Sequence, residues 1–293
     1  MSREAFKYDP AQQFTSGRHI HMSVRLHRYL ESLYGTFNRR EFVSPDPLQF
    51  LYGYPDPADR EIAALVCSAL AYGRVAQILR NLETVLSRLG PHPAGLVMRS
   101  RRQDLERLLA GIKHRFTTGE EIARLLGGAH NIIRKHGSLG ACLRGHISRG
   151  DETILPALDL FTRELRECSA GLDPYTLASP CRGSACKRLN LMLRWMVRRD
   201  DVDPGGWEGI PARLLVIPLD THMDSIGRAL GFTCRRQPDL TTALEITAGF
   251  RKVIPKDPVR YDFALTRFGI RSDLKIEHVT GKLKALCGPG SRQ

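Results

Sequence analysis

The chain has 293 residues, of which 42% are hydrophobic, so it can bury the core of one large domain or of two lobes. Its 44 Lys and Arg residues against 31 Asp and Glu residues give a net charge of +13, which excludes a near-neutral surface. A surplus of this size is typical of proteins that bind polyanions, because each phosphate that a cation neutralises releases bound counterions.

The sequence predicts a cytoplasmic protein without metal or cofactor. No apolar run approaches the ~20 residues of a membrane-spanning helix, and residues 1–18 lack the apolar segment of a signal peptide. The seven cysteines are odd in number and most lie within helical patterns, which favours reduced, buried or incidental thiols. The spacing of Cys181 and Cys186 fits neither a zinc knuckle nor an iron–sulfur loop, and no histidine spacing indicates a metal site.

Apolar residues recur at steps of three and four along nearly the whole chain, which predicts amphipathic helices. In chain order these stripes lie at residues 22–33, 62–70, 75–89, 122–133, 154–168, 189–196, 223–230, 243–253 and 261–268. Segments rich in proline and glycine separate them, and no segment alternates with period two for long. The sequence therefore predicts an all-α, two-lobed helical protein, with a single domain at 19–285 between flexible tails at 1–18 and 286–293.

The stripe at 189–196 belongs to a helix whose opposite face is basic. Polar residues follow on that face at steps of three, four and four: Lys187, Asn190, Arg194 and Arg198. A glycine turn just ahead of this helix offers free backbone N–H groups to a phosphate. The predicted DNA-binding residues are therefore Arg182, Gly183, Ser184, Arg188, Asn190, Arg194 and Arg198. The alternative is a solvated charged face with an ordinary helix cap at Ser184.

Lys187 and Asp220 are the candidate catalytic pair. A lysine amine attacks carbon only when it is neutral, and the positive charge of Arg194 and Arg198 would favour that form. Asp220 is placed to cap the next helix, with one carboxylate oxygen left to accept a proton from the lysine or to stabilise a cationic sugar. A purely structural cap is the alternative for Asp220, and Asp224, one turn later, could compete for its role.

Other polar and aromatic residues near these segments have structural interpretations. His222 is predicted to orient the loop before its helix rather than to catalyse. The acidic residues of 200–203 are expected to form a solvated loop with helix-capping roles, with a cation site as the alternative. Trp195 and Trp207 are expected in the core, and base stacking is the alternative for both.

Three segments, 187–198, 217–222 and 257–265, carry a resemblance to known families. They look like a microbial family named only as a domain of unknown function, over about 46–270. That family in turn resembles a distant branch of the helix-hairpin-helix DNA glycosylase superfamily, and the long gap from Lys187 to Asp220 is most similar to its archaeal 8-oxoguanine branch. The resemblance implies a hairpin that grips DNA, a lysine that attacks the sugar and an assisting aspartate in a Val-Asp-Thr-His type motif, to which Pro218-Leu-Asp-Thr-His222 is similar.

The chain also departs from the superfamily pattern. Its hairpin reads Pro-Cys-Arg-Gly instead of Pro-Gly-x-Gly, and Lys187 follows Gly183 by four residues instead of two. The usual glutamine wedge is not evident in residues 67–73, and the four-cysteine cluster of the endonuclease III branch is absent from the sequence. Asp220 therefore matches the superfamily motif more closely than Lys187 does.

Together the resemblance and the candidate pair predict a monomeric base-excision repair enzyme. Its substrate would be duplex DNA with a damaged base, 8-oxoguanine being the candidate, and its chemistry that of a DNA glycosylase with lysine Schiff-base AP-lyase activity. No cofactor would be required. Two alternatives stay open: a non-catalytic nucleic-acid-binding protein on a glycosylase scaffold, and an RNA-processing or nucleotide-handling enzyme.

Overall fold

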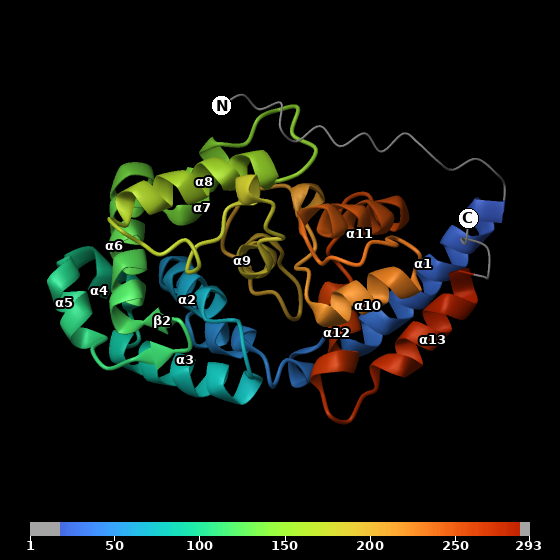
Figure 1. The fold of residues 1–293 in the computed structure, drawn as a ribbon, viewed down its shortest axis with the longest axis horizontal. Coiled ribbons are helices and arrows are strands. Elements are labelled where there is room, and N and C mark those ends of the chain that lie inside the picture. The colour runs from blue at the N-terminus through green and yellow to red at the C-terminus, as the bar shows by residue number, and fades with distance from the viewer. Residues whose placement is uncertain (1–17, 288–293) are drawn as a thin grey trace.

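The computed structural model describes residues 18–287 and is helical nearly throughout (Figure 1). This confirms the predicted all-α class. Both predicted tails lie almost wholly outside the described residues, since α1 begins at Arg18 and α13 ends at Cys287. None of the described helices is long and apolar enough to cross a membrane.

The elements follow one another with short connections. In chain order they are α1 (Arg18–Phe37), the 3-10 helices η2 (Arg40–Phe42) and η3 (Pro47–Gly53), α2 (Pro57–Ala69), α3 (Val75–Leu89), α4 (Pro93–Arg99), α5 (Arg102–Leu108), strands β1 (Lys113–His114) and β2 (Thr117–Thr118), α6 (Gly119–His136), α7 (Leu139–Gly145), α8 (Leu155–Cys168), η4 (Pro180–Arg182), α9 (Lys187–Val197), η5 (Ala212–Leu214), α10 (Thr221–Ala229), α11 (Leu240–Val253), α12 (Asp262–Ile270) and α13 (Ile276–Cys287).

Local sequence signals explain where many of these helices begin and end. The side chain of Asp56 accepts a hydrogen bond from the backbone of α2, and Pro57 follows as the first helical residue. Ser138 caps α7 in the same way. Gly90 and Gly137 end α3 and α6 with positive φ angles of 76° and 88°, a conformation that favours glycine.

The helices gather in two groups with α9 between them (Figure 1). Helices α3 to α6 and the two short strands lie in one group, and α10, α12 and α13 lie in the other. The first helix, α1, packs against α12 and α13, so the beginning of the described chain joins its end. Helix α9 packs against α2, and α6 packs against α8.

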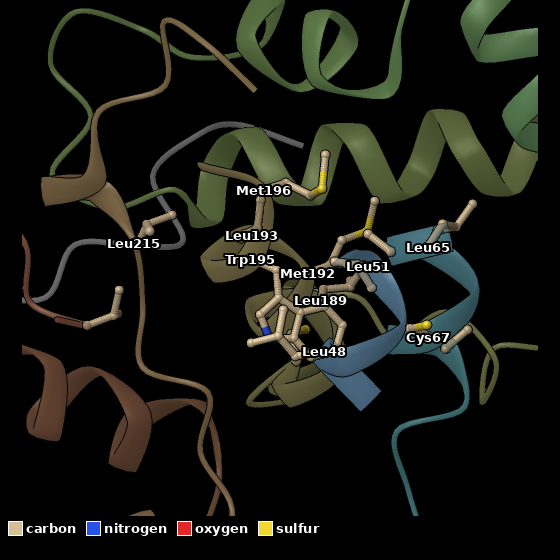
Figure 2. Packing of buried hydrophobic residues seen from close by; sticks show 14 of the residues in the cluster. Leu48, Leu51, Leu65, Cys67, Leu189, Met192, Leu193, Trp195, Met196 and Leu215 are labelled. Atoms are coloured by element: carbon tan, nitrogen blue, oxygen red, sulfur yellow. The ribbon is translucent and has the colours of Figure 1, made fainter. Parts of the chain in front are cut away.

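The apolar face of α9 lies deep in the core, as Figure 2 shows. Met192, Leu193 and Met196 are almost fully buried, close to the leucines of η3 and α2. Trp195 is 0% and Trp207 is 6% exposed, which confirms the core position expected for both. Burial of apolar side chains is the main force that holds a helix in a folded protein. Helix α9 is therefore a fixed support for Lys187, its first residue.

Candidate active site

Hydrogen bonds to Asp159 of α8 hold the turn before α9 in place. The Asp159 carboxylate accepts hydrogen bonds from the hydroxyl of Ser179 at 2.6 Å and from the backbone N–H of Cys181 at 3.1 Å. Burial opposes ionisation of Asp159, but these hydrogen bonds outweigh it and lower the pKa of the carboxyl. Gly183 then turns the chain with φ 74°, and a Cβ added there would meet nothing within 4 Å. The backbone of this turn is therefore fixed and open to close approach.

Lys187 is the first residue of α9 and Asp220 is the N-cap of α10. Asp220 accepts a hydrogen bond from the backbone N–H of Met223 through Oδ1 at 2.8 Å, while its Oδ2 lies 3.9 Å from Nζ of Lys187. The expected proximity of the two groups is thus present, with the cap held by one oxygen and the amine near the other. An ion pair this open to solvent contributes little to stability, so stability alone does not account for the arrangement.

Lys187 also lines a pocket of about 550 Å³. The pocket lies beside the end of α2, the turn at 183–186 and the residue before Asp220, which is Leu219. No side chain in the described part of the chain caps the N-terminus of α9, where Cys186 takes the left-handed conformation with φ 46°. The first-turn N–H groups and the positive end of the helix dipole therefore favour an anion next to the lysine.

Two aromatic residues that the sequence did not single out, Tyr72 and Tyr175, line this pocket. The buried His114 packs on Tyr72 and the exposed Phe116 packs on Tyr175, and we call these four residues the aromatic ridge. Tyr72 contacts His114 edge-on at 4.7 Å and Tyr175 at 5.4 Å between ring centroids, and Tyr175 contacts Phe116 at 5.4 Å. Phe116 is 69% exposed and Tyr175 is 45% exposed, although both are large apolar side chains. Exposed rings next to a pocket offer faces on which planar groups can stack.

Two arginines accompany the aromatic ridge. Arg115 stands in the two-residue turn between β1 and β2 with φ 54°, and its guanidinium lies 5.9 Å from the ring of Tyr72 and 5.6 Å from that of Phe116. Arg188 lies 5.1 Å from the rings of Tyr72 and Tyr175 and donates to the backbone carbonyls of Ala69 and Tyr175. The sequence Lys-His-Arg-Phe at 113–116 combines basic and aromatic residues, a combination that could have indicated a nucleic-acid-binding loop.

The predicted DNA-binding residues separate into accessible and inaccessible ones. Arg182 and Gly183 are exposed and Ser184 is half-buried, so the turn before α9 can still contact a phosphate. Arg188 is half-buried and holds the ridge to α2 through its hydrogen bonds. Ser184 accepts from the backbone N–H of Cys186 at 3.1 Å, and Cys186, not Ser184, is the N-cap of α9.

The expectation of an exposed basic face on α9 is wrong for its last three members. Asn190, Arg194 and Arg198 are 1%, 2% and 5% exposed, and the Asn190 amide donates to the carbonyl of Ala185. Arg194 pairs with Asp203 at 3.1 Å and with Asp262. Buried and paired, these arginines are not available to DNA phosphates.

Asp201 is exposed, as expected for a solvated loop, but Asp200 and Asp203 differ from that prediction. Arg198 pairs with Asp200 at 2.7 Å, with Asp203 and with Asp257 at 2.9 Å, and Asp203 is 0% exposed. Four carboxylates, Asp200, Asp203, Asp257 and Asp262, thus surround two guanidinium groups. The positive charge that Arg194 and Arg198 were expected to lend to Lys187 is therefore neutralised within the core.

His222 and Asp224 take structural positions. A Cβ added to Gly269 of α12 would lie 2.1 Å from Nδ1 of His222, so the imidazole packs directly on the backbone of α12. This contact gives His222 a packing role, and its predicted role in orienting the loop stays a prediction. Asp224 pairs with Arg228 at 2.9 Å one turn later on α10, so it is engaged away from the lysine. Asp220 is therefore the carboxylate that the structure brings to Lys187.

The comparison with protein families gives one match. A family model described as "Protein of unknown function (DUF2400)" matches residues 46–271, well over half of the chain. The chain belongs to this family. The matched range confirms the predicted resemblance to a domain of unknown function, and it contains Lys187, Asp220 and the whole aromatic ridge. No curated protein and no solved structure matches the chain, so the resemblance to DNA glycosylases stays a prediction from the sequence.

Proposed function

We propose that this protein is a DNA glycosylase that excises a damaged base, with 8-oxoguanine as the candidate lesion, and nicks the strand through a lysine Schiff base. The observation that carries the proposal is the 3.9 Å separation between Nζ of Lys187 and Oδ2 of Asp220 beside the pocket. A nucleophile and a proton acceptor held within reach of each other, next to a concave site, are the minimum for this chemistry.

Each component of the pair has a defined task in the proposed reaction. The neutral amine of Lys187 attacks C1′ of a flipped nucleotide, and the bond from C1′ to the base breaks with its electron pair leaving on the base. Asp220 accepts a proton from the attacking nitrogen, and the departing base takes up a proton. Ring opening of the sugar then gives the Schiff base between Nζ and C1′. Loss of a proton from C2′ and cleavage of the C3′–oxygen bond nick the strand.

The surroundings of the pair fit a nucleic-acid substrate. The pocket gives room for an extruded base, and the aromatic ridge offers rings on which bases can stack. The exposed turn at Arg182 and Gly183 and the uncapped start of α9 are suited to the phosphate backbone. The net charge of +13 favours a polyanionic partner in general.

Trapping with borohydride tests the proposal directly. The protein is incubated with a panel of duplexes, each with a single lesion, and borohydride reduces any Schiff base to a stable amine that joins protein to DNA. We expect a covalent adduct with at least one lesion and none with the undamaged duplex. If no duplex of the panel gives an adduct and the protein binds RNA more tightly than DNA at the same salt concentration, the RNA-processing alternative is favoured instead.

Replacing Asp220 separates its charge from its capping role. Asp220→Asn keeps a good N-cap, so its melting temperature should stay close to that of the wild type. Without an ionisable oxygen near Lys187, adduct formation should slow by about 10²- to 10⁴-fold. Asp220→Ala should in addition lose about 0.5–2 kcal/mol of stability. Thermal melts and trapping time courses check both variants, and an Asn variant that reacts at the wild-type rate would leave Asp220 with a structural role alone.

Removing the exposed ring of Phe116 should weaken DNA binding without unfolding the protein. Phe116→Ala is expected to lower duplex affinity by about 1–3 kcal/mol for each base that the ring stacks on. Because the side chain is 69% exposed, the melting temperature should hardly change. Val24→Ala, which removes an exposed apolar side chain from α1, is the matched control. If the two variants had equal DNA affinities in a fluorescence anisotropy titration, Phe116 would not contribute to DNA binding.

A further inference from the structure

A second cluster of reactive side chains lies where the ends of α6, α7 and α8 meet. It consists of His136, Cys142, His146 and Glu164. None of these residues lines the pocket beside Lys187. Cys142 is fully buried, while the other three side chains are 25%, 24% and 15% exposed, in the order His136, His146, Glu164. The cluster is therefore mostly enclosed and still reachable from solvent.

The donor atoms of the cluster converge on one small volume. One ligand atom each from His136, Cys142 and Glu164 lies within 4.8 Å of the other two. Nε2 of His146 lies 3.1 Å from Oε2 of Glu164 and 3.8 Å from Sγ of Cys142, and Sγ lies 3.6 Å from Oε2. Nε2 of His136 lies 2.7 Å from Oε1. In a tetrahedral zinc site, ligand atoms are about 3.3–3.6 Å apart, given zinc–ligand bonds of about 2.0–2.3 Å.

We propose that His136, Cys142, His146 and Glu164 bind one Zn²⁺ ion in a structural site. Two imidazoles, one thiolate and one carboxylate are the ligand types that zinc prefers, and four protein ligands fill its tetrahedral shell. The thiolate and the carboxylate balance the two charges of the ion. To bind a shared ion, the two imidazoles would turn away from their hydrogen bonds to Glu164, and the His146 ring, whose centroid lies 6.5 Å from that of His136, would move toward the other three ligands.

The positions of the ligands explain what the ion would do. His136 is the last residue of α6, Cys142 and His146 are one turn apart at α7, and Glu164 comes from α8. One ion would thus join three helices, and α8 also carries Asp159, which anchors the turn before Lys187. The nearest positive charge is Lys135, whose amine lies 2.6 Å from Oε1 of Glu164 and which is 66% exposed. This long side chain can move into solvent when the ion takes its place.

Sequence spacing did not reveal this site, and the proposal replaces the prediction of a metal-free protein. The four ligands are separated by five, three and seventeen residues, a pattern unlike a zinc knuckle. Only the packing of α6 against α7 and α8 brings them together. The cysteines at 181 and 186, which attracted attention by their spacing, take no part.

Metal content and cobalt spectroscopy test the site. The full chain, purified without a histidine tag and without chelator, should contain about one zinc ion per molecule, and chelator treatment should lower its melting temperature. Co²⁺ added to the metal-free protein should give tetrahedral d–d bands together with a thiolate-to-cobalt charge-transfer band. A metal-free protein that takes up neither ion from micromolar solution would overturn the proposal, and so would bound Co²⁺ without the charge-transfer band.

Ligand variants identify the atoms involved. Cys142→Ser should abolish the charge-transfer band, and His146→Gln should weaken zinc binding by at least about 100-fold. Cys181→Ser and His92→Gln replace an exposed cysteine and an exposed histidine outside the cluster, and both should bind zinc as the wild type does. If Cys142→Ser does not fold, the wild-type cobalt spectrum and His146→Gln still decide. A charge-transfer band that persists in Cys142→Ser, or unchanged affinity in His146→Gln, contradicts the assignment.

Discussion

Replacing Lys187 by glutamine is expected to abolish borohydride trapping and base release. Glutamine has no nucleophilic amine, so neither the attack on C1′ nor the Schiff base can form. Duplex binding should be nearly intact, because one cation is a small part of a net charge of +13. Gel electrophoresis of trapped adducts and an anisotropy titration with the same duplex measure the two effects.

Two further variants make this result specific to the nucleophile. Lys187→Arg keeps the positive charge but cannot lose its proton, so it should bind DNA as the wild type does and still give no adduct. Lys113→Gln removes an exposed lysine from β1, next to the aromatic ridge, and should retain trapping. If Lys187→Gln formed an adduct as readily as the wild type, another amine would be the nucleophile, and the non-catalytic and RNA-processing alternatives would gain weight.

The sequence predicted the helices whose apolar residues recur at steps of three and four, and it missed α13 at the end of the described chain. Helices such as α3 and α6 bury an apolar face and expose a polar one, so their apolar residues recur in the sequence with the helical period of 3.6. The seven-residue helices α4, α5 and α7 were missed because two turns are too few to establish a period. The paired strands of two residues each are held by contacts that no local pattern encodes.

Some residues of the candidate site could be predicted from their neighbours in the sequence, and others come together only in the folded chain. The cap at Asp220 was predictable because a carboxylate directly before an apolar stripe acts on its own helix. The aromatic ridge was not, because it joins residues 72, 114–116 and 175, which only the fold brings together. The helical period also predicted that Arg194 and Arg198 are exposed. It contains no information about Asp262 and Asp257, which lie 68 and 59 residues later in the chain and pair with these two arginines in the core.

Loss of the Arg194 guanidinium should cost more stability than any other single change considered for this chain. Arg194→Met keeps most of the volume and removes the charge that faces Asp203 and Asp262, which are 0% and 3% exposed in their side chains. A buried carboxylate left without its partner costs about 3–5 kcal/mol. Urea unfolding followed by circular dichroism measures the difference, and Arg199→Met, which alters the exposed arginine just after Arg198, is the control.

The pH dependence of this loss follows from Asp262, which loses its guanidinium partner, whereas Asp203 keeps its ion pair with Arg198. Burial raises the pKa of Asp262 from its ordinary value to about 6, and Arg194 acts against that rise. A carboxyl whose pKa is raised on folding binds its proton more tightly in the folded state, so its contribution to stability falls as pH increases from about 4 through about 6. Without Arg194 the pKa of Asp262 rises further, and the deficit of Arg194→Met should be small at about pH 5 and larger at about pH 8. A deficit equal at both pH values would mean that lost packing, not the unpaired charge, destabilises the variant.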